Sequence, residues 1–93
     1  MEYSRFPNRL KVYRMGVCLS QKQVAKVLGL PNTSKLSRWE HGYGYPSIEH
    51  LFYLCLLYKT IPQSIYTDLW QNISKDFFIR ENNLLAQHEP FTI

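Results

Sequence analysis

The sequence predicts an all-α protein, in which a compact bundle of five short helices is followed by a C-terminal aromatic helical tail. Three observations lead to this prediction. Apolar side chains recur at three- and four-residue intervals, which is the spacing of one face of a helix. Helix-starting residues precede several of these intervals, at Ser20, Ser47 and Pro62. The 93 residues are enough for one domain with a modest core.

The first helix is predicted to follow a frayed arm, residues 1–6, which carries Arg5. Pro7 suits the first turn of a helix, because the N–H group that proline lacks has no partner in that turn. We therefore expect this helix from Pro7 to Met15 or Val17.

The second helix is predicted from its start and its end. Ser20 followed by Gln23 is a capping-box pattern, in which each residue satisfies a backbone N–H group of the other. Gly29 tolerates a positive φ without steric cost and therefore ends the helix. These signals place the helix at about residues 21–28.

The third helix is expected over residues 33–41, capped by Asn32 or Thr33. Leu36 and Trp39 share one side of this helix and are expected to face the core. The other side carries short hydrogen-bonding side chains and two cations, which suit the reading of DNA base edges. A solvated polar face is the alternative. The residues on this side are Thr33, Ser34, Lys35, Ser37 and Arg38.

The second half of the chain begins with a glycine- and proline-rich loop, residues 42–46. Ser47 is predicted to cap a fourth helix that is apolar on more than one side and therefore central. Pro62 starts a fifth helix with Ile65, Tyr66 and Leu69 on its inner face. The expected inward side chains of the fourth helix are Ile48, Leu51, Phe52, Leu54, Cys55 and Tyr58.

The tail, residues 67–93, is predicted to belong to the same compact unit as residues 1–66. Its apolar residues suggest an amphipathic helix over residues 67–87, which Asn72 and Ser74, or the pair at 82–83, could interrupt. Whether this helix continues the fifth one stays open. Dimerisation and packing on the domain are equal alternatives for its aromatic surface, which consists of Trp70, Ile73, Phe77 and Phe78.

The positive charge is concentrated in the first half of the chain. Residues 1–46 contain eight Lys and Arg against two acids, a balance of +6. Residues 47–93 contain three cations against five acids, a balance of −2. A basic half indicates either a polyanionic partner or a solvated basic surface.

Several other functions find no support in the sequence. His50 and His88 share no metal-ligand spacing with a cysteine or another histidine, so we expect no metal and no cofactor. No nucleophile motif is present, so we expect no enzyme. Cys18 and Cys55 are expected as buried free thiols in a reducing cytoplasm. There is no apolar signal segment, and the longest apolar run, residues 51–58, is too short to span a bilayer.

The motifs taken together resemble the Cro/phage-repressor (XRE-type) helix-turn-helix family of lambda-repressor-like DNA-binding domains. The resemblance covers roughly residues 8–66. It rests on Leu19-Ser20-Gln21, Val24-Ala25, Leu28-Gly29, the run from Leu36 to Gly42, Pro46-Ser47 and Ile48-x-x-Leu51. It implies a five-helix domain that binds a two-fold operator as a homodimer. The turn before the third helix is one residue longer than the common family spacing.

The resemblance also implies roles for individual residues. The first turn of the third helix and Arg38 are expected in the major groove, with Thr33, Ser34, Lys35 and Ser37 as further base-reading residues. Arg14 and Glu40 are expected to form a structural ion pair between the first and third helices. For the tyrosines, packing on the domain is an equal alternative to a phosphate contact. The expected phosphate contacts are Ser20, Gln21, Asn32, His41, Tyr43 and Tyr45.

These observations favour a cytoplasmic, sequence-specific DNA-binding transcriptional regulator, expected to act as a repressor. Its partners would be double-stranded DNA and a second copy of the chain, with half-sites about one helical turn apart. Two alternatives stay open. One is the antitoxin of a toxin–antitoxin pair, in which the tail binds a toxin protein. The other is a protein-interaction module without DNA binding.

Overall fold

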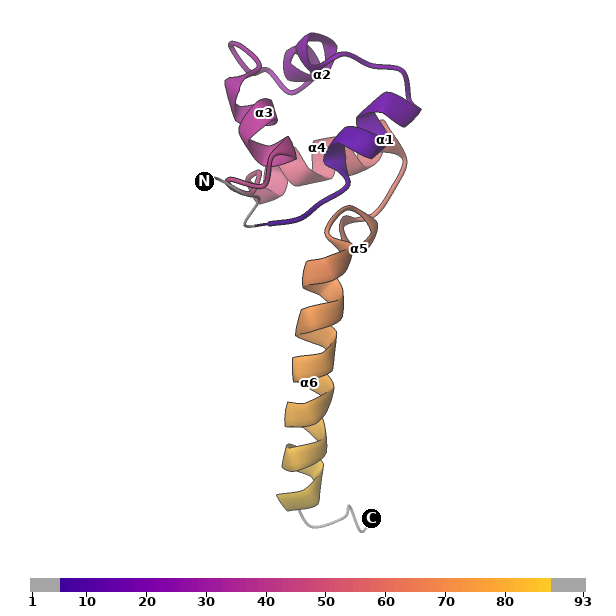
Figure 1. The fold of residues 1–93 in the computed structure, drawn as a ribbon, viewed down its shortest axis with the longest axis vertical. Coiled ribbons are helices and arrows are strands. Elements are labelled where there is room, and N and C mark those ends of the chain that lie inside the picture. Colours follow the sequence, from indigo (N-terminus) through magenta and orange to yellow (C-terminus); the bar gives the residue numbers. More distant parts are fainter. Residues whose placement is uncertain (1–5, 88–93) are drawn as a thin grey trace.

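Helices make up most of residues 6–87, the part of the chain that the computed structural model describes, and no strand occurs there. Figure 1 shows a compact body of short helices, from which a long C-terminal helix projects as a single rod. The all-α prediction is confirmed. The helices are α1 (Leu10–Gly16), α2 (Gln21–Val27), α3 (Ser34–Glu40), α4 (Ile48–Tyr58), α5 (Pro62–Ile65) and α6 (Thr67–Gln87).

The core of the body draws one fully buried side chain from each of its five helices. These side chains are Leu10, Val24, Leu36, Leu54 and Ile65. Burial of a leucine or isoleucine side chain stabilises a fold by about 1.5–3 kcal/mol. The core therefore fixes all five helices relative to one another, whereas α6 contributes no buried residue.

The start of α1 differs from the prediction, because the helix begins at Leu10 and leaves Pro7 outside it. The Asn8 side chain accounts for the difference. Its Oδ1 accepts a hydrogen bond from the Leu10 N–H at 3.0 Å, and its Nδ2 donates to the Trp39 carbonyl at 2.8 Å. Asn8 thus satisfies the first N–H group of α1 and ties the start of this helix to α3. Residues 1–5, with Arg5, lie outside the described part of the chain.

The expected burial of Cys18 is wrong. The chain turns after α1 at this residue, which has a φ of 61° and is exposed. The left-handed turn directs the side chain outward, and sequence spacing does not report this. Cys55 is partly buried, and this burial raises the pKa of its thiol. Neither cysteine forms a disulfide.

The segment from α2 to α3 follows its local signals closely. Ser20 Oγ accepts from the Gln23 N–H at 3.1 Å, and the Gln23 side chain accepts from the Ser20 N–H at 2.9 Å, so the capping box is confirmed. Gly29 has a φ of 73° just beyond the end of α2. Asn32 rather than Thr33 provides the side-chain bond at the start of α3, by accepting from the Ser34 N–H at 2.9 Å.

The cap of α4 is confirmed, but two of its expected inward residues are wrong. Ser47 Oγ accepts from the His50 N–H at 3.2 Å. Leu54 and Tyr58 are buried, whereas Ile48 and Phe52 are 71% and 56% exposed. The helix is apolar almost all round, so its sequence could not indicate that only one face would be covered.

The boundary between α5 and α6 answers the question of continuity. Pro62 starts α5 as predicted, and Tyr66, with φ −110° and ψ 58°, interrupts the helix before α6 begins at Thr67. The helix α6 then runs unbroken to Gln87, through all the asparagines that could have interrupted it. Leu69, which was expected to face inward, is 38% exposed.

Candidate nucleic-acid interface

The two sides of α3 have opposite environments. Leu36 and Trp39 are buried at 0% and 6% exposure and hold the helix against the body. The other side presents the exposed side chains of Ser34, Lys35 and Arg38, and Thr33 and Ser37 beside them are half-buried. The five residues that were predicted to read bases therefore lie together on one accessible surface.

The single acid of α3 is neutralised inside the protein. Glu40 lies on the inner side, where its Oε2 accepts from Arg14 Nε at 2.6 Å and its Oε1 accepts from Arg14 Nη2 at 3.2 Å. Only 2% of the Glu40 side chain and 11% of the Arg14 side chain are exposed. Hydrogen bonding to Glu40 raises the pKa of Arg14. The expected ion pair between α1 and α3 is present, and it leaves no carboxylate on the outer surface of α3.

Gln21 joins this pair from α2. Its Nε2 donates to Glu40 Oε1 at 2.9 Å, so the carboxylate links the first three helices. The side chain that was predicted to contact phosphate is thus engaged in the interior of the site. Sequence reasoning missed this role, and the only available signal was that a buried carboxylate needs more partners than one arginine can supply.

The other predicted phosphate contacts before α3 also have structural bonds. Ser20 caps α2 and Asn32 caps α3. Both side chains are exposed. The Ser20 hydroxyl and the Asn32 Nδ2 group can still donate hydrogen bonds, because each cap uses its side-chain oxygen as an acceptor. Capping and contact with an anion are therefore compatible at both positions.

The end of α3 carries a small exposed cluster. Arg38 Nη2 donates to the Tyr43 carbonyl at 3.3 Å, and the Tyr43 N–H donates to the Arg38 carbonyl at 2.9 Å. The His41 ring stacks on that of Tyr43, with centroids 6.2 Å apart and planes 9° apart. A guanidinium has five donors, so Arg38 keeps most of them for another partner.

Tyr45 differs from Tyr43 in its surroundings. Its ring lies 4.1 Å from that of Phe6 and 5.3 Å, edge-on, from that of Tyr66. These contacts hold the loop after α3 against the body. Tyr45 thus makes packing contacts while 44% of it stays exposed, and Tyr43 lies beside Arg38.

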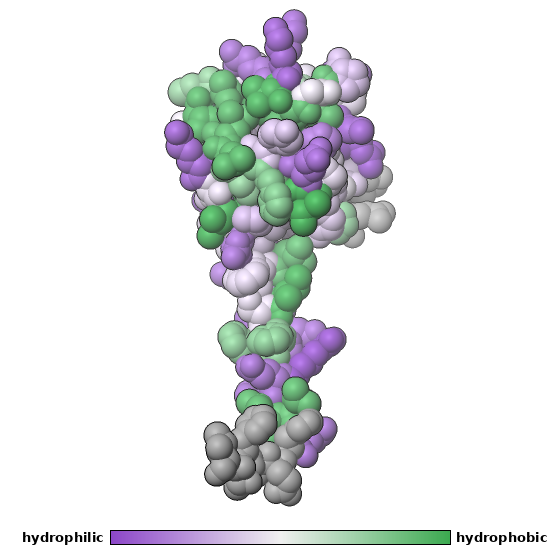
Figure 2. Space-filling model, turned by 180° about the vertical axis from the view of Figure 1, so that it is seen from behind, coloured by the Kyte–Doolittle hydropathy of each residue, from purple (hydrophilic) through white to green (hydrophobic). Residues whose placement is uncertain are grey.

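The charge around α3 is strongly one-sided. Glu40 is the one acid between residues 6 and 46, and Arg14 neutralises it. Every other Lys or Arg of this range is exposed. No acid between residues 6 and 46 is left to neutralise these six cations. These cations are Arg9, Lys11, Lys22, Lys26, Lys35 and Arg38. Figure 2 shows hydrophilic side chains at the end of the body that lies opposite α6.

Within residues 6–87, no group of His, Cys, Asp and Glu side chains is placed to hold a metal ion. No helix in this range is both long and apolar enough to cross a membrane. Comparisons with protein-family models, curated proteins and solved structures find no match to this chain.

Proposed function

We propose that this chain is a sequence-specific DNA-binding transcriptional regulator, in which α2 and α3 act as a lambda-repressor-like helix-turn-helix. The observation that carries the proposal is the division of α3. Leu36, Trp39 and Glu40 fix the helix to the body, and the opposite side presents only neutral polar and cationic side chains. A rigid helix with such a surface suits the major groove, which is wide enough to admit it.

The outer residues of α3 have the chemistry that base reading requires. Arg38 can donate two hydrogen bonds to O6 and N7 of guanine, and Lys35 can donate to the same edge. Thr33, Ser34 and Ser37 can donate or accept, so they suit several base edges. These five residues are the proposed readers of the operator.

Phosphate contacts would dock the protein before bases are read. The six exposed cations supply attraction that does not depend on sequence. Tyr43, next to Arg38, can donate a hydrogen bond to the DNA backbone at the end of α3. His41 can do so only as the imidazolium, from Nε2, because its Nδ1 already donates to the Ser37 carbonyl at 2.7 Å. Glu40 does not oppose this docking, because its charge is buried and paired.

A regulator of this kind would act on a two-fold site as a homodimer, with half-sites a whole number of helical turns apart. Repression follows most simply, because a bound dimer blocks access to the DNA it covers.

Variants of Arg38 test the reading role. Arg38→Ala should reduce the preference of the protein for its specific DNA site over random duplex DNA by about 1–3 kcal/mol. Arg38→Lys should keep the charge and the salt dependence of binding while losing the preference, because lysine cannot make the planar two-bond contact. Fluorescence anisotropy over a range of salt concentrations measures both quantities.

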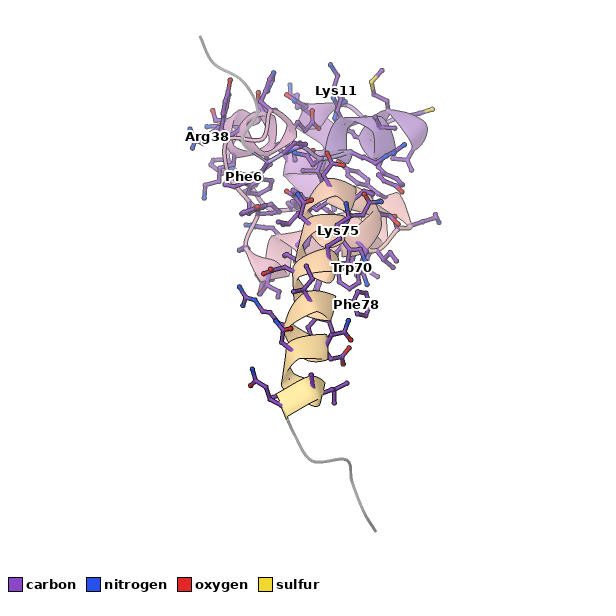
Figure 3. The ribbon with its side chains drawn as sticks, turned by 60° about the horizontal axis from the view of Figure 1, so that its bottom comes forward. Phe6, Lys11, Arg38, Trp70, Lys75 and Phe78 are labelled. Carbon is purple, nitrogen blue, oxygen red and sulfur yellow. The ribbon has the colours of Figure 1, made fainter. Side chains whose placement is uncertain are left out.

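Lys75→Ala is the matched control, because Lys75 is an exposed cation of α6, far from α3 (Figure 3). It should leave the site preference unchanged. If Arg38→Ala keeps the full preference, Arg38 is not the reader. If the natural chain does not bind duplex DNA even at low salt, the DNA-binding function itself is wrong, and a protein-interaction module becomes the better description.

A further inference from the structure

The helix α6 carries an apolar stripe with no cover from the described part of the chain. Trp70, Ile73 and Phe77 recur at three- and four-residue spacing, and each is more than half exposed. No residue of α6 is buried. A helix in a protein gains most of its stability by burying an apolar face against a neighbour. A 21-residue helix with this exposed stripe therefore needs a partner. Figure 2 shows apolar side chains along much of this helix.

The stripe leads into an apolar groove at the junction of α6 and the body. The groove has a volume of about 480 Å³. Trp70 and Ile73 belong to both the stripe and the groove, so the two form one continuous surface. Other side chains that line the groove are Tyr45, Leu51, Pro62 and Leu69.

We infer that this surface is covered by α6 of a second copy of the chain, and that the two helices run antiparallel. The inference goes beyond DNA binding and does not depend on it. In Figure 3, Trp70 and Phe78 lie on one side of the molecule and Arg38 on the other. Pairing through α6 therefore leaves the outer surface of α3 uncovered.

The straightness of α6 argues for a second copy rather than for contact within one chain. The helix is about 31 Å long at 1.5 Å per residue, and Figure 1 shows it leaving the body without a bend. Phe77 and Phe78 therefore lie away from the groove of their own chain. In an antiparallel pair, the far half of each helix lies against the groove of the other copy.

The charges of α6 decide the orientation. Arg80 follows Phe77 by three residues and therefore falls in the stripe. A parallel pair would place Arg80 against the partner's Arg80 and Asp76 beside the partner's Glu81, two contacts between like charges. An antiparallel pair sets Arg80 against an aromatic residue of the partner instead.

One antiparallel register pairs the residues of the stripe with residues of the partner, and it brings the two Asp76 side chains near the two-fold axis, where Arg80 of the same chain neutralises each of them. When Ile73 lies against the partner's Phe77, the partner's Arg80 lies over Trp70, where a guanidinium and an indole ring attract each other. Arg80 keeps its ion pair with Asp76, whose Oδ2 lies 3.0 Å from Arg80 Nη2. The groove extends the seam along α6, so each copy contributes residues of both α6 and the body to the interface.

The oligomeric state of the full chain tests the pairing. Analytical ultracentrifugation should give twice the chain mass of 11.1 kDa. Phe77→Glu should give a monomer, because it buries a charge in the seam. Ile79→Glu is the matched control, since Ile79 is similarly exposed but lies on the opposite side of α6, and this variant should stay dimeric. Circular dichroism checks that both variants keep their helices.

A natural chain that is monomeric at all accessible concentrations would overturn the inference. The apolar stripe of α6 would then be a binding surface for a different protein, such as a toxin. A dimer that survives Phe77→Glu would also overturn it. Neither result involves DNA, so the pairing and the proposed function can fail separately.

Disulfide formation tests the orientation in chains that lack the two native cysteines (Cys18→Ser, Cys55→Ala). A mixture of Gln63→Cys and Gln87→Cys chains should form the mixed disulfide, because the pairing places the last turn of one α6 at the groove of the partner, and Gln63 lines that groove. A disulfide between two Gln87→Cys chains would show a parallel pair and overturn the inference. A dimer that forms neither disulfide would overturn the seating in the groove.

Discussion

Removal of the Glu40 carboxylate should be among the most damaging changes on the inner side of α3. Glu40→Ala removes the acceptor of three hydrogen bonds and leaves Arg14 charged, with only 11% of its side chain exposed. Loss of one partner of a buried ion pair costs about 3–5 kcal/mol. Small domains have a free energy of unfolding of about 5–15 kcal/mol, so the variant would lose a large part of its stability.

Urea unfolding followed by far-UV circular dichroism measures this loss. Asp76→Ala provides the control, because Asp76 and Arg80 form the same kind of pair with 59% and 78% of their side chains exposed. Both variants are compared in the Phe77→Glu background, in which α6 is expected to be unpaired. An exposed pair contributes about 0–1 kcal/mol. The double variant Arg14→Met, Glu40→Met should be more stable than Glu40→Ala, since it leaves no unpaired charge. Equal losses for Glu40→Ala and Asp76→Ala would refute a structural role for the buried pair.

Two further predictions concern a cap and the buried tyrosines. Ser20→Ala should lower the free energy of unfolding by about 1 kcal/mol in the same urea assay, because the Gln23 N–H loses its acceptor; an unchanged midpoint would contradict the capping role. Burial raises the pKa of Tyr58 and Tyr66 above the ordinary value of about 10, so above that pH the folded chain keeps protons that the unfolded chain releases. The contribution of these two tyrosines to the free energy of unfolding should therefore be constant below pH 10. Above pH 10 it should fall, by up to about 1.4 kcal/mol per pH unit for each tyrosine. The double variant Tyr58→Phe, Tyr66→Phe should flatten this fall without loss of stability at neutral pH, because neither hydroxyl has a hydrogen-bond partner among the described residues. An unchanged slope of the free energy of unfolding against pH would show that these tyrosines do not cause the fall.

The features that the sequence predicted well depend on neighbouring residues. The capping box of Ser20 and Gln23 and the positive φ of Gly29 both arise within one helical turn. The end points of α6 agree with the prediction at both ends. The outer side of α3 could be predicted because Leu36 and Trp39 fix the inner side by their spacing.

The features that it missed depend on residues far apart in the chain. Pro7 lies outside α1 because Asn8 bonds to the carbonyl of Trp39, 31 residues away. The amide of Gln21 turns to Glu40, 19 residues away, rather than outward. The periodicity of an all-round apolar helix such as α4 could not show that Ile48 and Phe52 stay exposed.

Tyrosine and cysteine illustrate a second limit of prediction from the sequence, which concerns the direction of a side chain in a loop. Tyr43 and Tyr45 have the same side chain, two residues apart, yet the ring of one stacks on His41 and the ring of the other lies tilted against Phe6. The direction of each depends on the backbone of the loop after α3. The exposure of Cys18 depends in the same way on a single left-handed residue. Local composition does not determine either outcome.

Selection of bound sequences from a pool of random duplex DNA tests the central proposal most directly. We expect enrichment of a two-fold repeated site, with a guanine at the position that Arg38 contacts and with binding that weakens steeply as salt rises. The same selection with Arg38→Ala should relax the preference at that position alone. A natural chain that enriches no sequence, and that leaves the DNA pool unbound at low salt, would contradict the account.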